Sequence, residues 1–162
     1  MVETNRYYHD YIDRLDDGPS PEPDVTEADM FVFLALTIQM GHDVRDKLTD
    51  YRATVDQLYT PFYGTMMKRE RYLHILRYLN FTENRNEPDR TEENFDRPWK
   101  IRDLSEILNA TFSKFYNPSE NLAIGEVIVS FKGRVIFEQY IPKKRKRFGI
   151  KIFKLCYSNG YT

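Results

Sequence analysis

The chain has 162 residues, of which 41% are hydrophobic and 15% are aromatic, so it is long enough and apolar enough to bury a core. Its 24 lysines and arginines against 25 aspartates and glutamates give a formal net charge of −1, which excludes a protein that is basic over its whole surface. The single cysteine, Cys156, excludes a disulfide within the chain and a zinc site built on cysteines, and it fits a reducing compartment.

The N-terminal segment, residues 1–25, combines acidic residues, tyrosines and a proline cluster between residues 19 and 23. It has neither the basic region nor the apolar region of a secretory signal. No stretch of about 18 apolar residues occurs in the chain, so we expect no membrane span. Residues 7–15 allow a short helix, whereas residues 16–24 have the composition of a linker. We therefore expect a mobile N-terminal arm over residues 1–25.

The first strong helix signal begins at Thr26. Thr26 is a good N-cap residue, and Asp29 three positions later completes a capping box. Residues 30–40 are nearly all apolar, which predicts a helix that is buried on most of its sides. Gly41 stands where such a helix commonly ends.

Two further helices are predicted over residues 65–79 and 99–116, where apolar residues recur every three or four positions. The first has a basic side, which is either a solvated face or a contact for phosphate. That side consists of Lys68, Arg69, Arg71 and Arg77. The acidic stretch 81–97 between the helices lacks the ligand spacing of a calcium loop and is typical of a flexible connection. The second helix leads into the strands described next, and we expect it to pack on their sheet.

The rest of the chain predicts three strands in a meander, over residues 122–131, 135–141 and 148–157. Each segment is rich in β-branched or aromatic residues, and the second alternates its apolar side chains. Pro142 ends the second strand because it has no N–H for a ladder. A run of five basic residues, 143–147, connects the second strand to the third. The predicted fold class is therefore α+β, with a helical N-terminal part followed by a three-stranded sheet.

The same region carries a family resemblance. The blocks FSKFYNPSENLAI, SFKGR, QYIPKK, RFGIK and LCYSNGY resemble, in this order, the start of the catalytic domain of piggyBac-type transposases and the proteins derived from them. The resemblance implies a helical part of dimerisation and DNA-binding type over residues 26–118. It also implies the first three strands of an RNase H-like sheet over residues 119–162, incomplete at the C-terminus. Arg52 stands where the family commonly has a tryptophan, so we expect weaker core packing at that position.

The resemblance also implies a chemistry. Such enzymes cut and join DNA with metal-bound carboxylates, and the family uses magnesium. Its first carboxylate corresponds to Gly125, because the family has Ile-Asp-Glu where this chain has Ile-Gly-Glu, and its other carboxylates lie beyond Thr162. Glu126 does not replace the missing group, because adjacent strand residues point to opposite faces. We therefore expect a protein that is not an enzyme, with no catalytic residue, bound metal or cofactor.

The basic residues near the predicted sheet are the candidate DNA contacts. A basic run of this kind binds phosphate without reading sequence, or it acts as a nuclear import signal. We therefore expect non-specific DNA as the partner and a nuclear location, with an exposed loop that has no partner as the alternative. The candidate residues are Lys132, Arg134, Lys143, Lys144, Arg145, Lys146 and Arg147.

The sequence leaves three interpretations open. The leading one is a truncated, catalytically inactive protein that derives from a transposase and retains DNA binding. The second is a fragment of a DNA transposase whose remaining catalytic domain lies outside the sequence. The third is a protein-interaction module that uses the exposed edge of an incomplete sheet. Separately, we expect the uncovered apolar surface of such a sheet to favour self-association.

Overall fold

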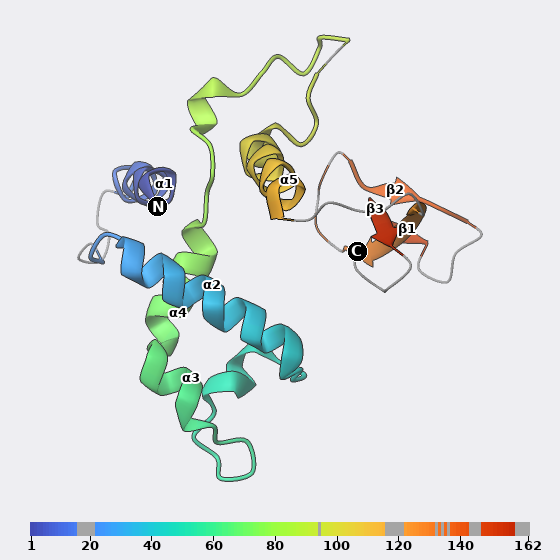
Figure 1. Ribbon diagram of the computed structural model, residues 1–162. Helices are drawn as coiled ribbons and strands as arrows, with labels where there is room; N and C mark the ends of the chain where they lie inside the picture. The colour runs from blue at the N-terminus through green and yellow to red at the C-terminus, as the bar shows by residue number, and fades with distance from the viewer. Residues whose placement is uncertain are drawn as a thin grey trace. The chain divides into compact units, whose positions relative to one another are not determined.

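The computed structural model describes residues 1–15, 22–93, 95–115, 122–131, 133, 135, 137–142 and 147–157. These residues divide into two compact units, residues 1–87 and residues 88–162, and each unit is described by itself. Figure 1 labels the helices and strands within them. In chain order the elements are α1 (Val2–Ile12), α2 (Glu27–His42), η1 (Leu48–Arg52), α3 (Pro61–Met66), α4 (Arg69–Tyr78), η2 (Asn84–Asn86), η3 (Trp99–Ile101), α5 (Arg102–Phe115), β1 (Leu122–Ser130), β2 (Gln139–Tyr140) and β3 (Phe148–Tyr157).

Helix α2 begins as its sequence predicts but is buried on one side only. The capping box is present, with the Asp29 amide donating to the Thr26 hydroxyl at 3.1 Å and the Thr26 amide donating to the Asp29 carboxylate at 3.0 Å. Phe33 and Leu36 are almost fully buried. On the opposite side Phe31 is 65% exposed, so the expectation that this helix is buried on most sides is wrong.

The helix expected over residues 65–79 is two helices. Pro61 occupies the first turn of α3, where a missing N–H costs no helical hydrogen bond. Met67 follows in an extended conformation, with φ −155° and ψ 131°, and α4 starts two residues later. This break turns the Met67 side chain into the core, where it is 6% exposed. The chain thus buries the Met67 side chain instead of continuing as one helix, although the spacing of its apolar residues favours an unbroken helix.

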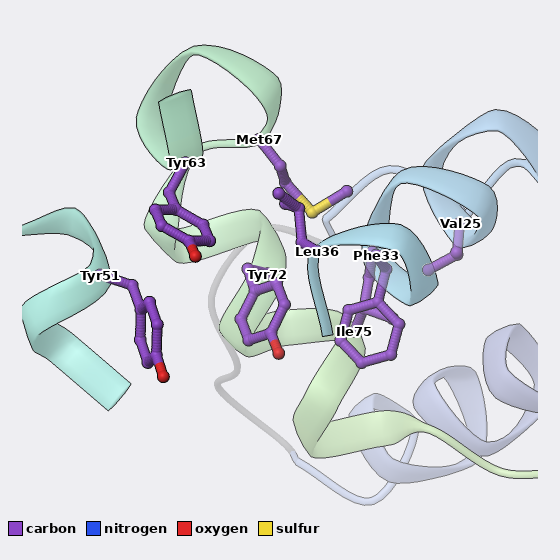
Figure 2. Packing of buried hydrophobic residues seen from close by; sticks show 8 residues of the cluster. All are labelled: Val25, Phe33, Leu36, Tyr51, Tyr63, Met67, Tyr72 and Ile75. Atoms are coloured by element: carbon purple, nitrogen blue, oxygen red, sulfur yellow. The ribbon is translucent and has the colours of Figure 1, made fainter. Parts of the chain in front are cut away.

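The core of the first unit joins α2, η1, α3 and α4. Figure 2 shows its aromatic and aliphatic side chains facing one another, with Phe33 beside Ile75 and Tyr72. The rings of Phe33 and Tyr72 have centroids 4.9 Å apart, and those of Tyr51 and Tyr63 have centroids 5.0 Å apart. Each large side chain buried in this way contributes about 1.5–3 kcal/mol before entropy is subtracted. The cluster consists of Val25, Phe33, Leu36, Tyr51, Tyr63, Met67, Tyr72 and Ile75.

Residues 2–12, which we expected within a mobile arm, form helix α1 and pack on α4. Thr4 is 1% exposed, and its hydroxyl donates to the Asn80 carbonyl at 3.1 Å. Tyr8 packs against two rings of α4, with centroid distances of 4.5 Å to His74 and 4.8 Å to Tyr78. The aromatic residues of this segment thus provide the burial that holds it. Burial also lowers the pKa of His74, so this histidine is part of the packing.

Arg52, where we expected weaker core packing, packs its guanidinium against the core. Its guanidinium carbon lies 4.3 Å from the centre of the Tyr72 ring, and its Nε donates to the Met67 carbonyl at 3.1 Å. Its Nη2 is buried without a hydrogen-bond partner among the described residues. Burial accordingly lowers the pKa of Arg52. The planar guanidinium therefore stacks on the core instead of leaving a gap there.

The sheet of the second unit is antiparallel and has the order β1-β3-β2. We expected a meander, in which the second strand would pair with the first. Instead β3 is central and pairs with β1 over the whole length of β1, from Leu122–Tyr157 to Ser130–Gly149. The second strand is reduced to two residues, Gln139 and Tyr140, which pair with the start of β3. The α+β class is confirmed, and the strand order is corrected.

Several large apolar side chains on both faces of this sheet are exposed. On one face Ile124 is 79% and Phe153 is 67% exposed, and on the other Val127 is 40% exposed. Helix α5, expected to pack on the sheet, buries none of its side chains among the described residues.

No helix in the described part of the chain combines the length and apolarity that crossing a membrane requires.

The two compact units meet in sequence at residues 87 and 88, not near residue 118. Helix α5 therefore belongs to the same unit as the sheet. The division into an N-terminal arm, a helical functional part over residues 26–118 and a catalytic-type part over residues 119–162 stays a prediction about function.

Candidate catalytic strand and nucleic-acid interface

Gly125 lies in the middle of β1, at the position that the resemblance gives to the first catalytic carboxylate. Its cross-strand partner is Lys154 of β3. A Cβ placed on Gly125 would meet the Cys156 sulfur at 3.6 Å, which is ordinary van der Waals contact. The sheet therefore has room for a side chain at this position, on the face that also carries Cys156.

Glu126 lies on the opposite face of the same strand. Its partner in the register is Phe153, and its carboxylate forms an ion pair with the Lys151 ammonium at 2.7 Å. The same ammonium lies 4.7 Å from the centre of the Phe153 ring. Glu126 is thus held by a side chain of its own face, as strand alternation predicts. It does not point toward the side on which a residue at position 125 would project.

The described residues do not by themselves fit a magnesium site. Among them, no three histidine, cysteine, aspartate or glutamate side chains lie close enough together to hold a metal ion. A hard divalent cation needs several oxygen ligands from different elements. We therefore derive no metal-dependent step from these residues.

Most of the candidate DNA contacts, namely Lys132, Arg134 and Lys143 to Lys146, lie outside the described residues. Arg147 is described and exposed, and its carbonyl accepts a hydrogen bond of 2.7 Å from the Ile141 amide just before β3. Lys151 and Lys154 follow on β3, on its two opposite faces. The described basic residues of β3, Lys151 and Lys154, therefore do not lie on a single face of the sheet.

The basic side of α4 is largely engaged within the first unit. The Arg71 guanidinium contacts the Asp29 carboxylate at 2.8 Å and donates to the carbonyls of Pro23 and Asp24. Arg69 pairs with its neighbour Glu70 at 3.1 Å, and Arg77 lies over the ring of Tyr11 at 5.5 Å. These contacts favour a structural role for this face over phosphate binding.

Charge separates between the two compact units. Residues 1–87 have 10 lysines and arginines and 16 aspartates and glutamates, a formal charge of −6. Residues 88–162 have 14 lysines and arginines and 9 aspartates and glutamates, a formal charge of +5. The near-neutral chain thus consists of an acidic unit that repels a polyanion and a basic unit that attracts one.

The family model described as transposase IS4 matches residues 1–162, the whole chain. The chain belongs to this transposase family. A solved structure of the piggyBac transposase synaptic complex with hairpin DNA matches 97% of the chain with a TM-score of 0.79 and 23% sequence identity. At this identity the likeness shows the fold. The resemblance to piggyBac-type transposases is therefore confirmed, and the chain spans 32% of the length of the matched transposase.

Membership of this family corrects one expectation. We expected the chain not to be an enzyme, but the family is one of DNA-cutting enzymes, and no described residue shows that this member is inactive. The expectation of inactivity depended on two observations: Gly125 stands at the position of the first carboxylate, and the resemblance places the other carboxylates beyond Thr162. Those two observations do not outweigh a family match over the whole chain.

The sequence did not reveal the Glu126–Lys151 pair. The two residues are separated by a predicted strand that we expected to pair with both β1 and β3. Only the direct pairing of β1 with β3 places Lys151 diagonally across from Glu126. The signal that was available was the equal length of the two predicted segments, 122–131 and 148–157, which favours their pairing with each other over pairing with the shorter segment 135–141.

Proposed function

We propose that this piggyBac-type chain is a nuclear protein that acts on DNA and holds the DNA backbone through the basic residues of its second unit. The observation that carries this proposal is the charge of +5 on residues 88–162 beside −6 on residues 1–87. Lysine and arginine contacts to phosphate give binding that does not depend on base sequence and weakens as salt rises. The matched transposase was solved with hairpin DNA, which supports the same class of partner here.

The test measures affinity for a short DNA duplex over a range of salt concentrations. Each phosphate contact contributes about 0.9 to the slope of log affinity against log salt. Changing Lys143, Lys144 and Arg147 to alanine should flatten the slope by up to about 2.7. The matched control changes Lys68, Arg69 and Arg77, which lie on the acidic unit, and it should leave affinity and slope nearly unchanged. Equal losses from both triple variants would reject the second unit as the DNA interface.

A second candidate function is DNA strand cleavage, which family membership favours. Supercoiled plasmid incubated with Mg²⁺ and this chain, or with a longer protein that contains it, reports cleavage as the relaxed form. We expect cleavage from a protein that also supplies the carboxylates implied by the resemblance. If neither protein nicks the plasmid, this candidate is rejected. Loss of cleavage on Glu126→Gln would assign the carboxylate of β1 a direct role.

A further inference from the structure

The loop over residues 53–60 joins η1 to α3 and ends at Thr60, directly before Pro61. Residues 54–59 are all exposed, as are Pro61 and Phe62, and Thr60 is half-buried. Figure 1 shows the loop projecting from the helices of the first unit. Thr60 is extended, with φ −130° and ψ 101°, as proline favours in the residue before it. Protein kinases that require proline directly after the acceptor residue bind an exposed, extended segment of this kind.

The Thr60 hydroxyl faces a cation. Thr60 stands at the N-cap of α3, but its side chain makes no capping hydrogen bond. It instead accepts a hydrogen bond of 2.5 Å from Nη2 of Arg45, its one printed partner among the described residues. Helix α3 begins with Pro61 and does not use this hydroxyl. A group added to the Thr60 oxygen therefore leaves the start of the helix intact.

The Arg45 guanidinium is held in place from several sides. Its side chain is 16% exposed. Its Nη1 donates to the carbonyl of Asp50 at 3.0 Å and to that of Leu58 at 2.6 Å. The ring of Tyr51 lies 5.5 Å from the guanidinium carbon. The cation is thus positioned beside Thr60 in advance, so binding an anion there requires little loss of side-chain entropy.

The charge of Arg45 is only partly neutralised. Among the described residues Asp43 is the one carboxylate within ion-pair distance of it, at 3.4 Å. The same Asp43 oxygen also accepts a hydrogen bond of 2.9 Å from the Tyr63 hydroxyl. Asp43 would repel a phosphate on Thr60, but its charge is shared between Arg45 and this hydroxyl. The bond from Arg45 to Thr60 would change from one with a neutral oxygen to one with an anion, which is about twice as strong.

We propose that Thr60 is phosphorylated by a proline-directed protein kinase and that Arg45 binds the phosphate. The Thr60 oxygen attacks the γ-phosphorus of ATP, and a new O–P bond forms as the bond from that phosphorus to the ADP oxygen breaks. The hydroxyl proton passes to a base of the kinase. The phosphate carries a charge of about −1.5 to −2 at neutral pH and fastens the end of the loop to Arg45. None of the residues proposed for DNA takes part, so this inference and the proposed function fail independently.

The first experiment locates the phosphate by mass spectrometry after incubation of the purified chain with ATP and a mitogen-activated or a cyclin-dependent kinase. The sequence has one other serine or threonine before proline, Ser20, so the experiment uses the Ser20→Ala chain. We expect phosphate on Thr60. Pro61→Ala keeps the hydroxyl and should slow the reaction by about tenfold or more. Thr54, exposed in the same loop but followed by valine, is the internal control. No phosphate on Thr60, or equal rates at Thr54 or in Pro61→Ala, would overturn the proposal.

The second experiment tests the role of Arg45 by ³¹P NMR of the phosphorylated chain as a function of pH. Pairing with Arg45 should lower the second pKa of the phosphate from about 6 to about 5. The same chain unfolded in urea should show the ordinary value of about 6. Arg45→Gln should restore that value in the folded chain, whereas Arg77→Gln, on α4, should not.

Circular dichroism checks that Arg45→Gln folds. If it does not, the comparison between the folded and the urea-unfolded parent chain decides, because it needs no variant. A phosphate pKa in the folded chain at or above the unfolded value would mean that repulsion by Asp43 exceeds attraction by Arg45. That result would overturn Arg45 as the phosphate ligand.

Discussion

Gly149 of β3 lies directly against the backbone of Val129 in β1. A Cβ placed on Gly149 would overlap the Val129 carbonyl oxygen, and it would also crowd the Ile128 side chain. At this point β3 pairs with two strands, since Gly149 is the partner of Ser130 on one side and of Gln139 on the other. The neighbours of Gly149 are therefore backbone atoms that cannot move away without breaking the sheet.

We predict that Gly149→Ala destabilises the sheet by about 1–3 kcal/mol, which is the usual cost of overpacking. Gly125→Ala is the matched control, because the Cβ it adds meets only the Cys156 sulfur at ordinary contact distance. That variant should be neutral, or more stable by about 0.5–1 kcal/mol because alanine restricts the unfolded chain. Urea unfolding of both variants measures the difference, and equal stabilities would contradict the close approach.

Gly125→Asp should also be tolerated. The position has room for a side chain, and Lys154 is its cross-strand partner, so the new carboxylate gains a neighbouring positive charge. Aspartate is a poor strand former, whereas the loss of glycine stabilises by about 0.5–1 kcal/mol, and the two effects largely cancel. We expect the free energy of unfolding to change by less than about 1 kcal/mol. A variant that fails to fold would show that β1 cannot present a carboxylate at this position.

Arg52 supports a third prediction, because its role in the core depends on the planar shape of its guanidinium. The group lies over the Tyr72 ring and donates from Nε to the Met67 carbonyl. Lysine keeps the charge but provides neither the flat face nor the same donor. We expect Arg52→Lys to lower the free energy of unfolding by about 1–2 kcal/mol. Lys47→Arg, at an exposed position before η1, is the control and should have little effect.

How far the sequence predicts this structure depends on how local each interaction is. The capping box of Thr26 and Asp29 was predicted correctly because both partners lie within one turn. The pairing of β1 with β3 was missed because it joins segments separated by a third predicted strand. The break at Met67 was missed because the helical pattern of apolar residues continues through it. The extended conformation of Met67 accompanies burial of its side chain in the core, and this tertiary contact is not visible in the local pattern.

In the candidate site, too, the local features were predicted correctly and the long-range contacts were not. The alternation of β1 predicted that Glu126 points away from the face of Gly125, and the structure agrees. The partner of Glu126 depends on strand order, which we predicted wrongly as a meander, so its pairing with Lys151 was missed. The apolar composition of α2 suggested burial on most sides, because composition alone does not distinguish a core from the exposed side of the helix that carries Phe31.

The fourth prediction concerns acid. The hydrogen bond from Arg71, opposed by burial and supported by the contacts with Thr26, lowers the pKa of Asp29 from 3.8 to about 2. A carboxyl whose pKa is lower in the folded state stabilises the fold above its unfolded pKa, and this stabilisation is lost as pH falls from 3.8 toward about 2. Asp29→Asn should lose this part of the acid dependence, whereas Asp46→Asn, at an exposed position, should retain it. Identical acid unfolding curves for the two variants would contradict the role of the Arg71–Asp29 pair.

The final prediction concerns alkali and Tyr63, the most deeply buried tyrosine among the described residues. Tyr63 is 1% exposed, and burial, followed by donation of its hydroxyl to the Asp43 carboxylate at 2.9 Å, raises its pKa from 10.0 to about 12. Because the folded chain holds the phenol proton more tightly than the unfolded chain, stability is fully present below pH 10 and falls as pH rises toward 12. Tyr63→Phe removes the proton and the hydrogen bond, so it should cost about 1.5–3 kcal/mol at neutral pH.

The difference in unfolding free energy between the parent chain and Tyr63→Phe is the quantity to measure, because it isolates the contribution of the Tyr63 hydroxyl from the effect of alkali on the rest of the chain. We expect this difference to shrink steadily between pH 10 and about 12, as the unfolded tyrosine ionises and the folded one does not. Tyr59→Phe is the control: Tyr59 is 56% exposed, so this variant should show no such change. A difference that stays constant across this range would mean that Tyr63 ionises as readily in the folded chain as in the unfolded one.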